Sequence, residues 1–417
     1  NENTLHTSDS NIEKTNTSSV SSNPSVNEIS SELKTIKPSK VIFEKKREHY
    51  FESIVLLDDS YIYLHRKENG DGDLYRYYFK TSKNYKIGTL KDHDARVNDA
   101  VLIDNKLYFY STSCPDNMLF YNIGLVTVDL NKNQVYASNK ELNCDICMYA
   151  KPLNNKIVTL KRGSKIKGDD HYIEQKICIY DPQTKIERCV LKNEYNQSFD
   201  VGVQFVQFGI GDDNNLYILE KISYKDPNHP KSNNKIVDKY GNFIVDGYDP
   251  ADYNSYKYEL KVYDKDFNYI KSLDFSDINP ISLEPDNMRF FDSIYYPWVV
   301  SNNYIAIRNI SNQLVIGKIE GNKIRHIYSY DQSPLSQSFA FSKNASNHFG
   351  LTFKAITKGD KNIYKFNTEK EVLEKIPYKI TRNASLHSLL ENQNYYLLIF
   401  NDYDTNFYPF YIAKSEI

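Results

Sequence analysis

Apolar and polar residues follow one another along this chain in a pattern that recurs. The recurring unit is an apolar stretch of strand length, then two to four Asp, Asn or Ser residues, then a second apolar stretch. Asp, Asn and Ser favour tight turns because their side chains hydrogen-bond to the nearby backbone, and Asn and Asp also adopt left-handed conformations. Each unit therefore predicts a β-hairpin. The copies are LLDDSYIYL from Leu56, LIDNKLYFY from Leu102, PLNNKIVTL from Pro152, IGDDNNLYIL from Ile210, VVSNNYIAI from Val299, NASNHFGLTF from Asn344 and LLENQNYYLLIF from Leu389.

A second hairpin follows the first in all copies but the last. Two hairpins within roughly 45 residues make a four-stranded unit, which is the period of a propeller blade. The last copy lacks its fourth strand, because the given sequence ends with NFYPFYIAKSEI after the third strand. KVIFEKK at 40–46 is predicted to supply that strand and so to close the ring without exposed edges. The second hairpins occupy 74–90, 124–138, 176–190, 259–273, 314–328 and 362–376, with turns predicted at Asn84, Asn131, Pro182, Asp266, Gly321 and Thr368.

This period and this hairpin chemistry resemble those of the β-propeller superfamily, over residues 40–417. The resemblance implies an all-β fold, namely a seven-bladed β-propeller of four-stranded blades whose last blade is closed by an N-terminal strand. The long interval between Ile210 and Val299 contains one second hairpin, so we interpret it as an insertion at 223–256 in blade four and not as an eighth blade. The chain has neither a WD dipeptide nor an S-x-D-x-G-x-x-W box, so the resemblance does not extend to WD-repeat or sialidase families.

The first 39 residues differ from the rest of the chain. They are rich in Ser, Thr and Asn and contain no aromatic residue. Such a segment cannot bury enough apolar surface to offset its ordering entropy, so we expect a disordered polar tether. A tether that begins at Asn1 suits an exported protein whose signal peptide has been removed, or a lipoprotein whose lipid anchor lies upstream of residue 1. A trimmed cytosolic protein with a polar tail is the alternative.

Composition narrows the possible functions. Of 417 residues, 36 are Tyr and 21 are Phe, and these residue types favour strands. The net charge of −2 and the interspersed charges indicate no nucleic-acid partner, which would need a basic face. The longest apolar run, 395–400, is far too short for a transmembrane span. From the polar tether described above, we expect a protein that is secreted or otherwise extracytoplasmic, at the cell surface or in the periplasm. We also expect a monomer.

No motif points to a known catalytic centre or cofactor. The G-x-S-x-G elbow of serine hydrolases is absent, and GIGDDN at 209–214 leads into a hairpin and not into a dinucleotide-binding helix. We expect no cofactor. Oxygen ligands around the glycines of ENGDGD could hold calcium, which makes Asp71 and Asp73 weak metal candidates beside the simpler interpretation of a solvated turn.

The chain has five cysteines, Cys114, Cys144, Cys147, Cys178 and Cys189. The single C-x-x-C at 144–147 lacks the second pair of ligands that a zinc site needs. Cys178 and Cys189 are predicted to face each other across the second hairpin of the third unit. They either form a disulfide in an oxidising compartment or remain as two thiols in apolar surroundings.

Six of the nine histidines are predicted to lie in loops that share one face of a propeller, around its central funnel. They are His49, His65, His93, His171, His229 and His387. Imidazole titrates near neutral pH, and arginine binds carboxylates bidentately. The alternative is that these histidines are simply exposed. The candidate ligand-binding residues are His65, Arg66, His93, Arg96, His171, Arg382, His387 and, from the insertion, Tyr248.

Two functions are compatible with these features. The first is an exported or surface-tethered binding module that holds a glycan, peptide or protein ligand on the funnel face and has no catalytic motif. The second is a funnel-face polysaccharide lyase or other glycoside-active enzyme, in which His, Arg and Tyr perform acid–base chemistry. Convergence of two histidines and an arginine deep in the funnel would favour the enzyme, since the fold itself does not decide function.

Overall fold

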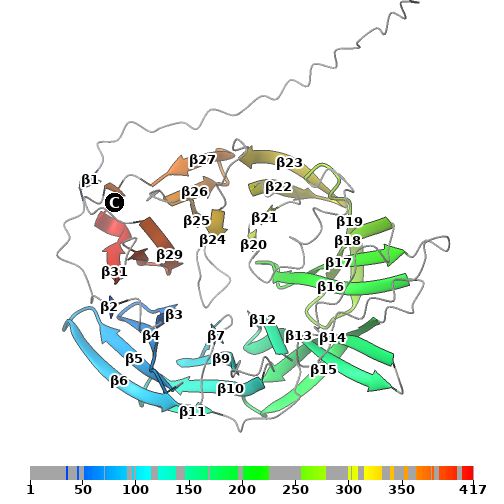
Figure 1. The fold of residues 1–417 in the computed structure, drawn as a ribbon. Coiled ribbons are helices and arrows are strands. Elements are labelled where there is room, and N and C mark those ends of the chain that lie inside the picture. Colours follow the sequence, from blue (N-terminus) through cyan, green and yellow to red (C-terminus); the bar gives the residue numbers. More distant parts are fainter. Residues whose placement is uncertain are drawn as a thin grey trace, which may run out of the picture.

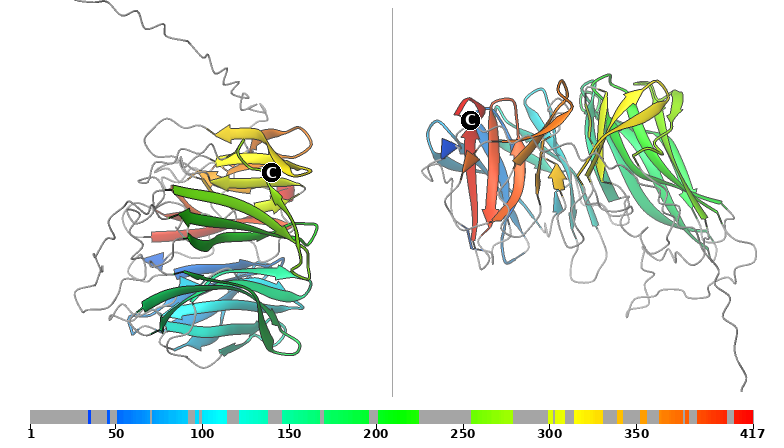
Figure 2. Two further views of the ribbon diagram at one scale, coloured as in Figure 1. Left: turned by 90° about the vertical axis from the view of Figure 1, so that its right-hand side faces the viewer. Right: turned by 90° about the horizontal axis from the view of Figure 1, so that it is seen from above.

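The computed structural model of the protein is a ring of antiparallel β-sheets around a central axis (Figure 1; Figure 2). The only helix among the described residues is a single 3-10 turn, Lys414–Glu416. The fold is therefore an all-β propeller with four-stranded blades, as predicted. The structure describes residues 34–35, 45–46, 51–69, 71–91, 96–97, 100–113, 121–137, 146–167, 170–195, 201–224, 255–278, 299–301, 303–308, 314–330, 339–341, 352–355, 363–376, 378–379, 385–401 and 406–416.

We number the sheets by the chain order of their innermost strands (Figure 1). Sheet one is β3 (Phe51–Leu56), β4 (Ser60–Arg66), β5 (Gly72–Tyr78) and β6 (Lys83–Leu90); sheet three is β12 (Ile146–Leu153), β13 (Lys156–Lys167), β14 (Asp170–Asp181) and β15 (Ile186–Tyr195). Sheet four is β16 (Val201–Ile210), β17 (Leu216–Tyr224), β18 (Ser255–Tyr263) and β19 (Tyr269–Leu273); sheet five is β20 (Val299–Ser301), β21 (Tyr304–Arg308), β22 (Leu314–Glu320) and β23 (Lys323–Tyr330). Sheet six is β24 (Phe339–Phe341), β25 (Thr352–Ala355), β26 (Ile363–Asn367) and β27 (Val372–Lys375); sheet seven is β29 (Ser385–Glu391), β30 (Tyr395–Asn401), β31 (Asn406–Ala413) and β2 (Lys45–Lys46).

Sheet two departs from the predicted four-stranded pattern. It contains β7 (Arg96–Val97), β8 (Val101–Ile103), β9 (Lys106–Ser113), β10 (Tyr121–Asp129) and β11 (Gln134–Ala137). β7 and β8 both pair with β9, and Ala100, directly before β8, is not part of a strand. Within the described part of the chain, six sheets are thus four-stranded blades, and the predicted count of seven four-stranded blades is not confirmed.

The N-terminal part of the chain supplies the outermost strand of sheet seven. β2 pairs antiparallel with β31, with Lys45 opposite Phe407 and Lys46 opposite Asn406, which is the pairing predicted for 40–46 over a shorter span. β1 (Lys34–Thr35) lies within the predicted tether, and it pairs in parallel with β28 (Tyr378–Lys379). Residues 1–33 of the tether lie outside the described residues.

The turns follow from the residues that first suggested the repeat. In the first hairpins of sheets two and three, both central turn residues have positive φ: Asp104 and Asn105, then Asn154 and Asn155. Two successive left-handed residues form the turn whose twist matches a β-hairpin, and Asn and Asp tolerate it best. One predicted turn is wrong. Asn84 lies inside β6, and the chain turns earlier, ending at Ser82, whose φ is +53°.

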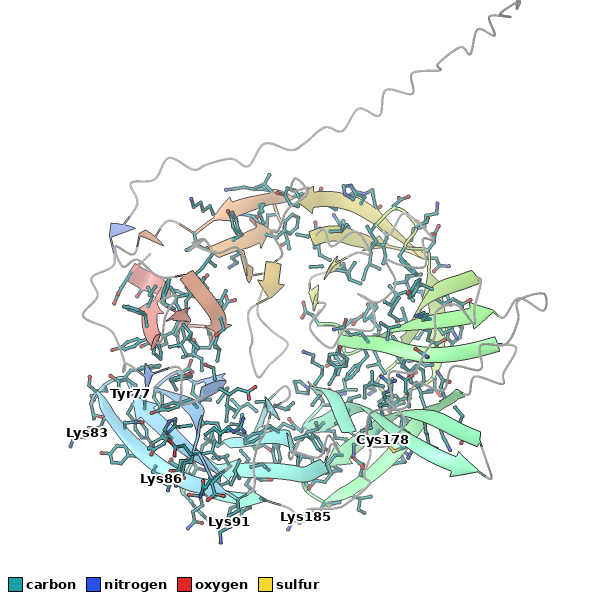
Figure 3. All side chains as sticks on the ribbon, in the orientation of Figure 1. Tyr77, Lys83, Lys86, Lys91, Cys178 and Lys185 are labelled. Carbon is teal, nitrogen blue, oxygen red and sulfur yellow. A yellow bond between two sulfur atoms is a disulfide. The ribbon has the colours of Figure 1, made fainter. Side chains whose placement is uncertain are left out.

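Aromatic residues fill the boundary where the two ends of the ring meet. Tyr61, Tyr63 and Tyr77 of sheet one are buried together with Leu397 and Ile399 of sheet seven. The ring of Phe79 stacks on that of Tyr411 with 4.3 Å between centroids. Tyr77 lies on the side of sheet one that faces sheet seven (Figure 3). Burial of these large side chains stabilises the closed ring by far more than the short pairing of β2.

A polar side chain also crosses most boundaries between sheets. It donates a hydrogen bond from one sheet to the next sheet around the ring. The described donors and their acceptors are Arg76 to the carbonyl of Leu130, Tyr110 to Glu187, Gln175 to the carbonyl of Phe205, Lys271 to the carbonyl of Gly321, Tyr304 to Glu371, and Asn394 to Asp58. We call these the cross-sheet contacts.

Arg76 makes the most extensive cross-sheet contact. Its guanidinium is buried and donates to the carbonyl of Leu130 at 2.7 Å and to Oδ1 of Asn133 at 2.8 Å, both in sheet two. It also donates to the hydroxyl of Ser60 at 2.9 Å in its own sheet. Hydrogen bonds from a charged donor are stronger than neutral ones, and leaving their buried acceptors unpaired is costly.

We expect Arg76→Ala to lower the free energy of unfolding by about 3 kcal/mol, because it leaves a buried carbonyl and a buried hydroxyl without their donor. Equilibrium urea unfolding measures this. The matched control is Arg325→Ala, since Arg325 is exposed and pairs on the surface with Glu320 at 3.0 Å and, across the boundary to sheet six, with Glu371 at 3.7 Å. An exposed ion pair contributes less than about 1 kcal/mol. Equal losses in the two variants would show that the buried contact has no special weight.

Candidate functional site

The structure places the described candidate residues on strands and not in loops, which corrects the sequence prediction. His65 and Arg66 are the last two residues of β4, and Arg96 begins β7. His171 lies in β14 opposite Ile166, and His387 lies in β29. The strands extend further toward the loop end of the sheets than their polar residues suggested. His49, His93, His229, Tyr248 and Arg382 lie outside the described residues.

These candidates are distributed over separate sheets. His65 and Arg66 belong to sheet one, Arg96 to sheet two, His171 to sheet three and His387 to sheet seven. Among these described candidates, only His65 and Arg66 lie on the same strand. On β5, Asp73 pairs with His65 and Gly72 pairs with Arg66. Asp73 is the centre of a cluster of polar side chains at this end of sheet one.

Asp73 is buried and completely enclosed by donors. Its Oδ2 lies 3.0 Å from the ammonium of Lys67, and its Oδ1 lies 2.9 Å from that of Lys86. The hydroxyl of Thr89 donates to Oδ1 at 2.7 Å. Figure 3 labels Lys86 on the outer strand of sheet one. With one ammonium on each oxygen, the carboxylate is neutralised by lysine in this structure, and its role as a weak calcium candidate stays a prediction.

The same contacts set the protonation state of Asp73. Burial raises the pKa of its carboxyl, but the hydrogen bonds from Lys86, Thr89 and Lys67 lower it further, so the pKa lies below its ordinary value of 3.8. A carboxylate held ionised in this way is a poor general base near neutral pH. Asp71, the other weak metal candidate, accepts a hydrogen bond from the side-chain amide of Asn69 at 3.0 Å. It forms part of a turn.

Three further buried carboxylates in the described sheets are paired with lysine. Glu220 lies 2.6 Å from the ammonium of Lys261, and Glu391 lies 2.6 Å from that of Lys414. Glu174 pairs with Lys176 and Lys192. In each of these pairs the ammonium neutralises the charge of the carboxylate.

The clearest reactive group that the sequence left open is the cysteine pair of sheet three. Cys178 and Cys189 are direct partners on β14 and β15, and they form a disulfide. Figure 3 shows the bond beside the label of Cys178. Cys178 is buried and Cys189 is exposed. The spacing of the two cysteines across a hairpin turn was the signal that could find this bond, but spacing could not separate it from two free thiols.

Comparisons with known proteins add little beyond the fold. No protein-family model matches the sequence. No curated protein matches it either. None of the described segments is a helix long and apolar enough to span a membrane.

Several solved structures share the propeller fold at low similarity. The β-propeller domain of the Trilobed protease from Pyrococcus furiosus is 9% identical with a TM-score of 0.45, and the match covers 88% of this chain and 97% of that one. An acylaminoacyl peptidase from Pyrococcus horikoshii is 10% identical with a TM-score of 0.44, over 86% of this chain and 52% of that one. An uncharacterised protein from Listeria monocytogenes is 12% identical with a TM-score of 0.42, over 89% of this chain and 92% of that one.

This chain spans only 52% of an acylaminoacyl peptidase and 47% of a prolyl endopeptidase that it matches. Such matches concern the fold alone. They nevertheless contradict the predicted binding module on the funnel face, because the propellers found include domains of peptidases and the comparisons support no binding-module role. That prediction and its glycoside-active alternative are not retained.

The environment of Asp73 generates a pH-dependent prediction. Its folded pKa is lowered, so its stabilising contribution is fully present above the unfolded pKa and is lost as pH falls through the folded value. We expect Asp73→Asn to lower the free energy of unfolding by about 2 kcal/mol at pH 7 and by progressively less below pH 3.8. Urea unfolding at a series of pH values measures the difference.

The matched control for Asp73→Asn is Asp266→Asn, because Asp266 is an exposed carboxylate in a turn of sheet four. Its substitution should change stability by less than about 0.5 kcal/mol at every pH. A deficit in Asp73→Asn that stays constant into the acid range would show that the ionised carboxylate is not what stabilises sheet one.

Proposed function

We propose that this chain is a rigid, non-catalytic propeller scaffold that works outside the cytosol. The observation that carries the proposal is the series of cross-sheet contacts. At most boundaries between the described sheets, a polar side chain of a type that could bind or activate a substrate is hydrogen-bonded to the next sheet instead. Arg76, Tyr304 and Gln175 are examples. Side chains that are hydrogen-bonded in this way make the ring stiff. They also leave few of the described polar residues available to catalyse a reaction.

A stiff ring gives fixed anchor points to the segments that connect its strands. β17 and β18 stay paired up to Tyr224 and Ser255, the two residues that flank the connection 225–254. The insertion predicted at 223–256 therefore begins and ends at one fixed point in sheet four. Holding such connections in register is the role that we assign to the scaffold.

We also infer that the ring has seven blades, with the five-stranded sheet two occupying the remaining position. Sheet two packs against sheet one through Val126 and Val128, and against sheet three through Tyr108 and Tyr110. A sheet that is packed on both faces by its neighbours occupies a blade position. Images of the protein viewed along the ring axis test this count directly.

The scaffold proposal predicts that the purified chain turns over no substrate. We expect no hydrolysis of peptide or ester substrates and no cleavage of acidic or neutral polysaccharides above the buffer rate, with His65→Ala and Arg66→Ala indistinguishable from the wild type. Backbone amides of all sheets should exchange hydrogen slowly, because they are held in one cooperative ring. Turnover that one of these substitutions abolishes would overturn the proposal.

The extracytoplasmic location is supported by the disulfide, since such bonds persist in oxidising compartments and are rare in the cytosol. When the chain is expressed with and without an export signal, we expect the peptides that contain Cys178 and Cys189 to be joined in the exported protein only. Mass spectrometry after alkylation of free thiols measures this. Alkylated Cys178 and Cys189 in the folded, exported protein would contradict the proposed location.

A further inference from the structure

Three side chains of metal-binding type lie together on the outer part of sheet three. Cys178 and Cys189 are opposite each other, and Glu187 lies two residues before Cys189, on the same face of β15. The ligand atoms of all three lie within 4.8 Å of one another. Cys189 and Glu187 are exposed while Cys178 is buried, so an ion can reach the group from solvent on one side.

A buried hydroxyl next to this group has no hydrogen-bond partner. Thr159 on β13 pairs directly with Cys178, so their side chains leave the sheet on the same face. Thr159 is fully buried and its Oγ1 makes no hydrogen bond. An unsatisfied buried hydroxyl destabilises the fold, because its interactions with water are lost and not replaced. A disulfide sulfur is only a weak acceptor, whereas a thiolate at Cys178 would carry a charge for the hydroxyl to bind.

We propose that the reduced chain binds Zn²⁺ through the thiolates of Cys178 and Cys189 and the carboxylate of Glu187. Thiolate and carboxylate ligands suit this borderline-soft ion, and three protein ligands leave a fourth tetrahedral position for water. The disulfide is then the metal-free state of the same site. The exposure of Glu187 and Cys189 provides the entry path that a metal site requires.

The charges balance in both states because of Lys161. Its ammonium lies 2.5 Å from Oε1 of Glu187. In the oxidised chain, one carboxylate faces one ammonium. In the metal-bound chain, two thiolates and one carboxylate carry three negative charges, and Zn²⁺ and Lys161 carry three positive charges. No other partner is needed to neutralise either state.

The conversion consumes a dithiol reductant and releases protons. The dithiol transfers two electrons to the Cys178–Cys189 bond, the S–S bond breaks, and the reductant becomes a cyclic disulfide. The two thiols formed lose their protons to solvent as Zn²⁺ binds both sulfurs. One chain disulfide, one dithiol and one Zn²⁺ thus give one zinc dithiolate, one oxidised reductant and two protons.

Residues around the group orient the carboxylate ligand. Lys161 binds one oxygen of Glu187 and leaves the other free for the ion, and the hydroxyl of Tyr110 donates to the same Oε1 at 3.4 Å from sheet two. Partners that fix a ligand in this way typically change metal affinity about 10- to 100-fold. Lys161 and Tyr110 are therefore positioning residues for the site.

The test uses Co²⁺ as a spectroscopic probe of the zinc site. The chain with Cys114, Cys144 and Cys147 replaced by Ser is reduced with a dithiol, desalted without oxygen and titrated with Co²⁺. We expect one Co²⁺ per chain, with thiolate-to-cobalt charge-transfer absorption and the intense visible bands of a tetrahedral ion. The oxidised chain should show neither signal. Absence of both signals from the reduced, folded chain would overturn the proposal.

Three variants of the same chain assign the ligands. Cys189→Ser should abolish the charge-transfer band, Glu187→Gln should weaken Co²⁺ binding, and Lys161→Ala should weaken it about 10- to 100-fold. Lys185→Ala is the matched control, since Lys185 is an exposed lysine in the turn of the same hairpin (Figure 3). The Co²⁺ affinity of this variant should equal that of the parent chain. Binding that survives Cys189→Ser, or that Glu187→Gln leaves intact, would contradict the assignment. Should the three serine substitutions prevent folding, comparison of the wild type with Cys189→Ser gives the same answer.

Discussion

The cross-sheet hydrogen bond is the contact on which the rest of the ring depends. Each sheet is built by local hairpins, and local hairpins alone do not determine how one sheet sits on the next. Apolar side chains bury area between sheets, but that attraction is not directional. A donor such as Arg76, fixed in one sheet and bonded to Leu130 and Asn133 in the next, defines a single rotation and height for the pair. Repetition of such contacts around the ring makes a ring of defined geometry from similar units.

The ring also needs a strong seam where its two ends meet. At that seam the polar contact, from Asn394 to Asp58, is exposed and therefore weak. The aromatic cluster around Tyr61 and Tyr63 compensates, because burial of large flat side chains contributes the most per residue. The hydroxyl groups of both tyrosines keep partners, Ser53 for Tyr61 and Asn84 for Tyr63. Burial raises the pKa of both phenols, so they stay neutral and do not disrupt the seam.

The sequence revealed the local features of this fold and missed those that join distant residues. Turns at Asn105, Asn155 and Gly321 are encoded by the residues that occupy them, so the hairpins and the repeat could be predicted. Arg76 and its acceptor Leu130 are 54 residues apart, and no local pattern connects them. The histidines were misplaced for a related reason. β13 and β14 continue as a ladder to Lys167 and Asp170, so His171 is a paired strand residue despite its polar surroundings.

The proposed zinc site shows how a structural contact and a reactive group can share one carboxylate. Glu187 is the acceptor of the cross-sheet contact from Tyr110, and it is also the only carboxylate among the described residues that groups with the two cysteines. At the boundary between sheets five and six, Glu371 accepts from Tyr304 and Lys318 in a similar way, but no cysteine of the described residues is grouped with it. Chemistry at the cysteine pair would therefore act directly on one boundary of the ring. An ion bound there would draw Glu187 toward the sulfurs and alter its hydrogen bond to sheet two, so the state of two cysteines would be transmitted to the packing of neighbouring sheets.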